Sequence, residues 1–156
     1  MTDLALLVLR LGTAALMIGF HGHGRLVRAV DYVVRGEAWP FVKLVHELGF
    51  PGAPLFALAS ALAESAGAVL VGIGLWTRFA GAALAGNMLV ALVNEWLGGD
   101  PIELPAIYFV VSLAVVLAGA GRYSVDAALA RRRGERDRGV AVALPAPVAV
   151  PGSDAR

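Results

Sequence analysis

Residues 55–76 read LFALASALAESAGAVLVGIGLW, an apolar run that contains a single charged residue, Glu64. As an α-helix this run is about 33 Å long, which is enough to cross a hydrocarbon core of about 30 Å. Glu64 would then lie near the middle of the membrane, where a carboxylate is unfavourable unless it is protonated, paired or hydrated. The stretch therefore predicts a membrane-spanning helix that carries an acid for a specific reason.

The composition of the whole chain supports a membrane protein. Of its 156 residues, 58% are hydrophobic and only 16% are charged, and the mean hydropathy is +0.73. No apolar run has a polar face wide enough to meet water, which disfavours a soluble helical bundle. We therefore predict an all-α, integral membrane four-helix bundle over residues 1–129, with spans at residues 4–20, 55–76, 79–97 and 102–120.

The distribution of arginine predicts how the bundle is oriented. Arg78, Arg122 and the arginines of residues 131–138 fall on the side of both termini, and the third loop has none. The positive-inside rule then places both termini in the cytoplasm. Asp3 stands where a signal peptide would be basic, so residues 4–20 are expected to remain as a span.

Two segments outside the spans have their own character. The first loop, residues 21–54, is long, and its helical spacing of apolar residues predicts one or two short helices on the outer membrane surface. Residues 130–156 begin as a basic segment and become rich in Ala, Pro and Val. We expect its arginines to lie at anionic headgroups and the segment to form a disordered cytoplasmic tail.

Three polar residues form a candidate polar core. Arg10 and Glu64 lie at similar depths in two antiparallel spans, so we expect them to form a buried pair, because neither charge is stable alone in hydrocarbon. Asn87 comes to a similar depth and is expected to join them. Such a pair either fixes only the helix register, with Arg10 extended to the cytoplasmic headgroups, or handles a proton or a ligand. Both interpretations stay open at this point.

A second polar group is expected where the spans reach the outer surface. His21 and His23 point apart on a helix and have no further ligand beside them, so no metal site is predicted. The chain contains no cysteine, so any redox role requires a bound cofactor or a partner protein. The candidate ligand-binding residues at this end are His21, Arg25, Asn94, Glu103 and Tyr108.

Six short motifs follow one another along residues 4–129. They are LRL at 9–11, HGHGRL at 21–26, AESAG at 63–67, GLWTR at 74–78, Glu103-Leu104 with Tyr108, and GRYSVD at 121–126. In this order the set resembles the pattern of the DoxX family. Arg25 stands where the family usually has Lys, the first loop is longer than the family pattern, and the tail has no counterpart. The resemblance singles out the turn residues Thr77, Arg78, Arg122, Tyr123 and Asp126.

The resemblance implies a small four-helix protein of the bacterial inner membrane. The family is similar to the DoxD-type membrane subunit of thiosulfate:quinone oxidoreductase, and some members are linked to membrane complexes that protect against oxidative stress. A redox-associated subunit or accessory protein is therefore expected, rather than a self-sufficient enzyme, with quinone as its candidate cofactor. In that role Glu64 would exchange a proton, and His21 or Tyr108 would hydrogen-bond a carbonyl oxygen.

Two other functions remain open. The chain could be a non-catalytic anchor or assembly factor that binds partner proteins through the loop around residues 39–50. A small transporter is the third alternative, although four helices leave little room for a path unless the chain forms a homo-oligomer. The expected partners are the lipid bilayer, redox proteins and a second copy of the chain, with no nucleic acid.

Overall fold

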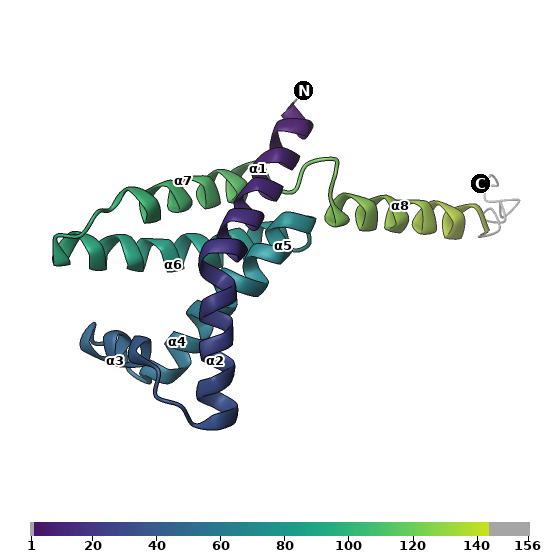
Figure 1. Cartoon of the computed structure of the whole chain (residues 1–156). Helices are drawn as coiled ribbons and strands as arrows, with labels where there is room; N and C mark the ends of the chain where they lie inside the picture. Colours follow the sequence, from purple (N-terminus) through teal and green to yellow (C-terminus); the bar gives the residue numbers. More distant parts are fainter. Residues whose placement is uncertain (1, 144–156) are drawn as a thin grey trace, which may run out of the picture.

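A computed structural model describes residues 2–143 of the chain, and these residues form helices joined by short connections (Figure 1). Two of the ten segments, η1 and η2, are π-helical. In chain order the segments are α1 (Thr2–Met17), η1 (Ile18–Gly22), α2 (His23–Arg35), α3 (Pro40–Glu47), α4 (Ala53–Leu62), η2 (Ala63–Gly67), α5 (Ala68–Ile73), α6 (Thr77–Gly98), α7 (Glu103–Ala118) and α8 (Val125–Ala143).

Three continuous helices are long and apolar enough to cross a membrane. They are α1–η1–α2 over Thr2–Arg35, α4–η2–α5 over Ala53–Ile73, and α6 over Thr77–Gly98. The fourth predicted span corresponds to α7, a shorter apolar helix of 16 residues. The all-α class and the membrane location are thus supported, and a bundle of four complete spans stays a prediction.

The sequence predicts that the first span ends at Phe20, just before the motif HGHGRL at 21–26. In the structure the first helix does not end there. It continues through η1 into α2 and stops at Arg35, where Gly36 takes a left-handed conformation with φ of 69°. The glycines of the motif are helical, and membrane helices tolerate such glycines well. The predicted outer loop is therefore shorter: of the one or two short helices expected in it, α3 is a separate helix, whereas α2 continues the first long helix.

The two π-helical segments pack against one another where the two long helices cross. Gly22 of η1 makes this close approach, because a Cβ atom there would lie 2.6 Å from the main-chain oxygen of Glu64 in η2. A π-helical turn inserts an extra residue into a helix and is frequent at functional sites. Glu64, the acid of the apolar span, therefore lies where the two long helices cross.

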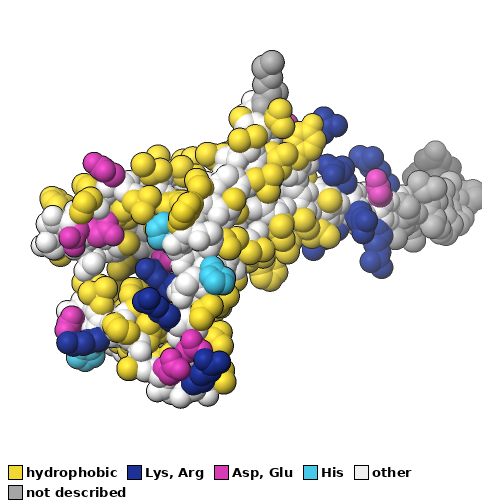
Figure 2. All heavy atoms as spheres, viewed as in Figure 1, with side chains coloured by type: hydrophobic (Ala, Val, Ile, Leu, Met, Phe, Trp, Pro, Cys, Tyr) yellow, Lys and Arg dark blue, Asp and Glu magenta, His cyan; other side chains and the backbone are white. Residues whose placement is uncertain are grey.

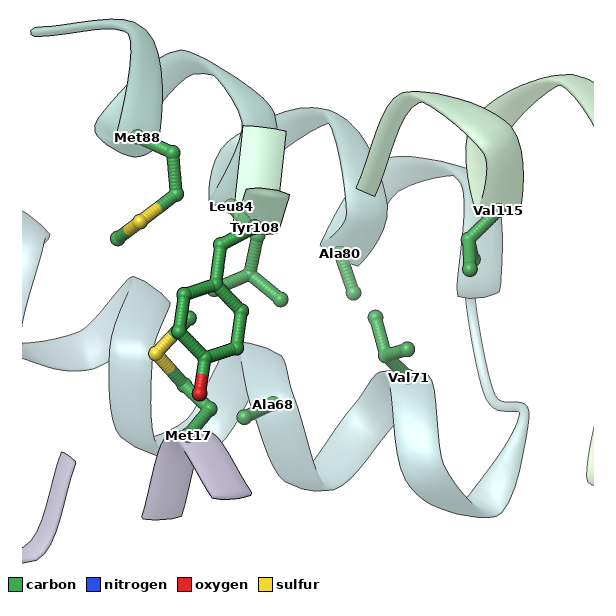
Figure 3. Close-up of a cluster of buried hydrophobic side chains, with 8 residues drawn as sticks. All are labelled: Met17, Ala68, Val71, Ala80, Leu84, Met88, Tyr108 and Val115. Atoms are coloured by element: carbon green, nitrogen blue, oxygen red, sulfur yellow. The ribbon is translucent and has the colours of Figure 1, made fainter. Parts of the chain in front are cut away.

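Two hydrophobic cores lie on either side of this crossing. In the larger core, Tyr108 of α7 reaches toward Met17 of α1 (Figure 3). Its buried residues are Met17, Ala68, Val71, Ala80, Leu84, Met88, Tyr108 and Val115. The smaller core joins α2, α3 and α4 through Ala29, Trp39, Val45, Ala53, Ala57 and Ala61.

The N-terminus, the α5–α6 turn and the α7–α8 connection meet at one end, which we call the terminal end. The carboxylate of Asp3 accepts a hydrogen bond from the main-chain nitrogen of Arg122 at 2.9 Å. The main-chain nitrogen of Asp126 donates to the carbonyl of Gly74, also at 2.9 Å. The other end holds α2, α3 and the α6–α7 turn.

Helix α8 projects away from the rest of the molecule (Figure 1). Ser124 caps it by accepting a hydrogen bond from the main-chain nitrogen of Ala127 at 3.1 Å. Residues 130–143 are therefore helical, whereas their composition had predicted disorder, because Ala, Arg and Glu favour helices. The rest of the predicted tail, residues 144–156, lies outside the described residues.

The outer surface of the spans is apolar, as contact with lipid requires. Large hydrophobic side chains cover the visible face, and basic side chains gather on α8 (Figure 2). Phe79 and Leu97, near the two ends of α6, are 81% and 80% exposed. Such a surface would be unstable in water, and a bilayer satisfies it.

Candidate functional site: a buried carboxylate beside an apolar cavity

Glu64 is the centre of a polar cluster that we call the carboxylate cluster, which also contains Arg25 and Asn87. Its side chain is only 2% exposed. The Oε1 atom accepts a hydrogen bond from the Asn87 amide at 2.7 Å and forms an ion pair with the Arg25 guanidinium. These partners come from α6 and α2, so three separate helices build the cluster around η2.

The predicted buried pair between Arg10 and Glu64 does not form. Arg10 is fully buried, but its guanidinium donates to the main-chain carbonyl of Tyr123 at the terminal end. Equal depth along the helices misled the prediction, because a long arginine side chain places its charge well away from its own backbone. The continuation of the first helix past Phe20 brings Arg25, instead, to Glu64.

The turn motifs build a second polar cluster at the terminal end, which we call the terminal cluster. One oxygen of Asp126 accepts from the main-chain nitrogen of Trp76 at 2.9 Å. Its other oxygen accepts from the main-chain nitrogen of Thr77 at 3.1 Å and from the Thr77 hydroxyl at 2.9 Å. With Arg10 on Tyr123, these bonds tie α1, the α5–α6 turn and α8 together.

The electrostatics of Asp126 follow from this arrangement. Burial opposes ionisation of the carboxyl group, but the hydrogen bonds from Thr77 and Trp76 and the positive charge of Arg10 outweigh it. The pKa of Asp126 is therefore held below its ordinary value. The remaining turn residues are more peripheral: Arg122 contributes its main-chain nitrogen, and Arg78 lies against Gly119.

A cavity of about 470 Å³ lies between α3, α4 and α6, beside the carboxylate cluster. Figure 2 shows a hollow between the upper helices and the α2–α3 layer, with basic side chains at its inner end. Arg25 and Asn87 form part of its wall, and Asn94 and Glu95 lie farther along α6. The other lining residues are apolar or small, apart from Ser60: Phe41, Leu44, Val45, Leu48, Phe50, Phe56, Ala59, Ala63, Ala82, Ala83, Gly86, Val90 and Ala91.

Helix α3 holds Arg25 in place at the cavity wall. The Arg25 guanidinium carbon lies 4.6 Å from the ring centroid of Phe41, a cation–π arrangement. The Phe41 ring in turn lies 5.5 Å from the ring of Trp39, which is buried in the smaller core. The guanidinium can thus bond Glu64 on one side while its edge faces the cavity.

The predicted outer-end group divides between three places. His21 and Tyr108 pack edge-on, with ring centroids 5.8 Å apart and an angle of 78° between the rings, and neither lines the cavity. Arg25 and Asn94 do line it. Glu103, at the first turn of α7, is exposed and takes no part.

Several buried polar atoms in this region lack a hydrogen-bond partner among the described residues. They are Oε2 of Glu64, Nδ1 of His21 and Oε2 of Glu95. Buried polar groups are otherwise almost always paired, so these atoms are free to accept a hydrogen bond from a ligand or donate one to it. Within residues 2–143, no three His, Asp or Glu side chains come together as a metal site.

Sequence reasoning missed some residues of the site. Ser60, whose hydroxyl lies 3.5 Å from the Arg25 guanidinium, precedes Glu64 by four residues, and this helical spacing was a usable signal. Phe41, Phe50 and Phe56 carry no such signal, because they come together only when α3 folds back on α4.

Comparison with known families gives two matches. The DoxX model matches residues 5–95, which include every member of the carboxylate cluster. The model described as TQO small subunit DoxD matches residues 55–146. Neither a curated protein nor a solved structure matches the chain significantly. Because the DoxX match covers more than half of the sequence, this chain belongs to the DoxX family of membrane proteins.

Proposed function

We propose that this chain is a redox-associated membrane subunit or accessory protein that binds a quinone in the cavity beside Glu64. The observation that carries the proposal is an apolar cavity whose polar wall, Arg25 and Asn87, is bonded directly to a buried carboxylate. The match to the TQO small subunit DoxD supports the association with a quinone-reactive complex.

The cavity suits the chemistry of a quinone. A quinone has a flat ring with carbonyl oxygens that accept hydrogen bonds, and it carries an apolar tail. Arg25 and Asn87 have N–H groups beyond those they use on Glu64, and the phenylalanines offer flat apolar faces. A volume of about 470 Å³ lies within the range of small-molecule sites, roughly 300–1,000 Å³.

Glu64 is placed to manage a proton for the bound ligand. Reduction of a quinone to a quinol consumes two electrons and two protons; in this proposal the free Oε2 atom of Glu64 delivers one proton and water supplies the other. In this proposal the electrons come from a partner subunit that carries a redox cofactor. The proposal also places both termini in the cytoplasm.

Fluorescence quenching tests the proposal directly. Trp39 is buried next to Phe41 of the cavity wall, whereas Trp76 and Trp96 are exposed, so a Trp76→Phe, Trp96→Phe background isolates the reporter. A soluble short-chain ubiquinone added to this protein in detergent should quench Trp39 saturably. Absence of saturable quenching would contradict the proposal.

Variants show whether the carboxylate cluster provides the binding. Arg25→Gln and Glu64→Gln should weaken quinone binding roughly 10- to 100-fold, because the first removes the charge of the cavity wall and the second removes the carboxylate that holds Arg25 and Asn87 in position. Glu103→Gln is the matched control, since Glu103 is exposed and does not line the cavity. If all three variants bind quinone with equal affinity, Glu64 does not contribute to the binding site.

A further inference from the structure

The cavity has an opening that faces sideways from the helices. Ala59 of α4 and Ala82, Ala83 and Gly86 of α6 line the cavity and have accessible surface in the folded chain. The cavity is open to the exterior rather than enclosed, and these small residues lie along it. The small side chains of α4 and α6 therefore flank a gap that leads into the cavity.

The rim of this opening is apolar. Leu44, Leu48, Phe56 and Val90 line the cavity and are 37%, 36%, 45% and 40% exposed. The buried carboxylate lies behind the inner wall, bonded to Arg25 and Asn87. An opening into water would expose this apolar rim at a cost, whereas an opening into lipid would not.

The position of the gap along α6 agrees with an opening into lipid. Residues 82–86 lie roughly 8 to 14 Å from the start of α6, and the whole helix is about 33 Å long. A helix of this length spans the hydrocarbon core, so these residues lie inside it. A Cβ atom placed on Gly86 would meet no other atom within 4 Å, which shows that the gap has free space.

We infer that the ligand reaches the cavity laterally from the bilayer, through the gap between α4 and α6. This inference rests on the proposed function and specifies its ligand class: a membrane-resident quinone with an isoprenoid tail. The ring lies at Arg25 and Asn87, and the tail leaves through the gap into lipid. Small residues at the gap are required because the tail must lie between the two helices.

Two quinones that differ only in their tails test this route. In proteoliposomes, the probes are ubiquinone-10 and its tail-free ring compound, dimethoxy-methyl-benzoquinone, with Trp39 as the reporter. Ala83→Phe and Gly86→Phe place a ring in the gap and should slow association of ubiquinone-10 at least roughly tenfold, since the tail needs the gap open. Binding of the tail-free ring should change less than roughly twofold.

Gly12→Phe is the matched control, because Gly12 is an exposed glycine of α1 with equal free space and no part in the cavity. Two gap variants are used so that one remains if the other fails to insert. If both quinones bind as in the wild type, or if both are lost equally, the lateral route is wrong. Failure of the wild type to bind either quinone contradicts the proposed function instead.

Discussion

The chain places an arginine near an acid in two clusters, each with one buried member (Arg10 in one, Glu64 in the other), and the two clusters are built differently. In the terminal cluster, Arg10 bonds to a main-chain carbonyl, and Asp126 binds two main-chain nitrogens and one hydroxyl. In the carboxylate cluster, the bonds of Glu64 run only between side chains, from three helices. One cluster holds turns together, and the other borders a cavity.

This difference separates a structural cluster from a reactive one. Bonds to the backbone cannot change partner without reshaping a turn, so the terminal cluster is expected to matter for stability. Side chains that bond one another can exchange a partner for a ligand while the helices stay in place. Both clusters contain buried atoms without a partner among the described residues, Nε and Nη1 of Arg10 and Oε2 of Glu64, but only the cluster of Glu64 borders a cavity that could supply a ligand.

The largest loss of stability is expected from Arg10→Gln. The shorter, neutral side chain loses the bond to Tyr123 and leaves Asp126 without a nearby positive charge, which should cost about 3 kcal/mol of unfolding free energy. SDS titration followed by circular dichroism measures it. Arg28→Gln, at an exposed position of α2, should change little, and equal losses in both variants would contradict a structural role for Arg10.

A smaller loss is expected at the crossing of the two π-helical segments. In Gly22→Ala the new methyl group would meet the Glu64 carbonyl, so η1 must move away at a cost of about 2 kcal/mol. Gly19→Ala, in the same segment, has free space and should be neutral or stabilising. Gly22→Ala should also weaken quinone binding, because it displaces Arg25 from Glu64. Equal stability of Gly22→Ala and Gly19→Ala would contradict the close contact between Gly22 and the Glu64 carbonyl.

The pH dependence of stability should report on Asp126. Its pKa is lower in the folded chain than in the unfolded chain, so its contribution is complete above about pH 4 and is lost as the pH falls through the lowered pKa. Unfolding in detergent between pH 2.5 and 7 should show a loss of stability on the acid side. Asp126→Asn should reduce this dependence of stability on pH, whereas the control Asp100→Asn should keep it. If Asp126→Asn leaves the dependence unchanged, another titratable group is responsible for it.

The sequence was sufficient for the elements whose signal is local. Length and hydropathy predict a helix at residues 55–76, which the structure has at Ala53–Ile73 with a turn at residues 74–76, and they predict its acid, since both properties are carried by consecutive residues. The depth argument also brings Asn87 to Glu64, because an amide side chain is short and stays near its own helical turn. The family motifs identify Thr77 and Asp126 before any contact between them is known.

Two features could not be predicted from local sequence patterns: which residues Arg10 and Arg25 bond to, and the presence of the cavity. Whether Arg10 or Arg25 meets Glu64 depends on which way each long side chain extends and on the helix continuing past Phe20. The cavity depends on α3 folding back from a loop onto α4, a contact between segments that periodicity does not report. Helix α8 was misjudged because its charges obscured residues that favour a helix.

The smallest effect on stability is expected from Glu64→Gln. Glutamine keeps an oxygen that accepts from Asn87, and removal of a buried charge offsets the weaker contact with Arg25, which is 31% exposed. The change should therefore be under about 1 kcal/mol in the same SDS titration, although quinone binding falls. This contrast is decisive for the comparison of the two clusters. If Glu64→Gln destabilises the chain as strongly as Arg10→Gln, the carboxylate cluster is structural too, and it no longer supports the cavity as a ligand-binding site.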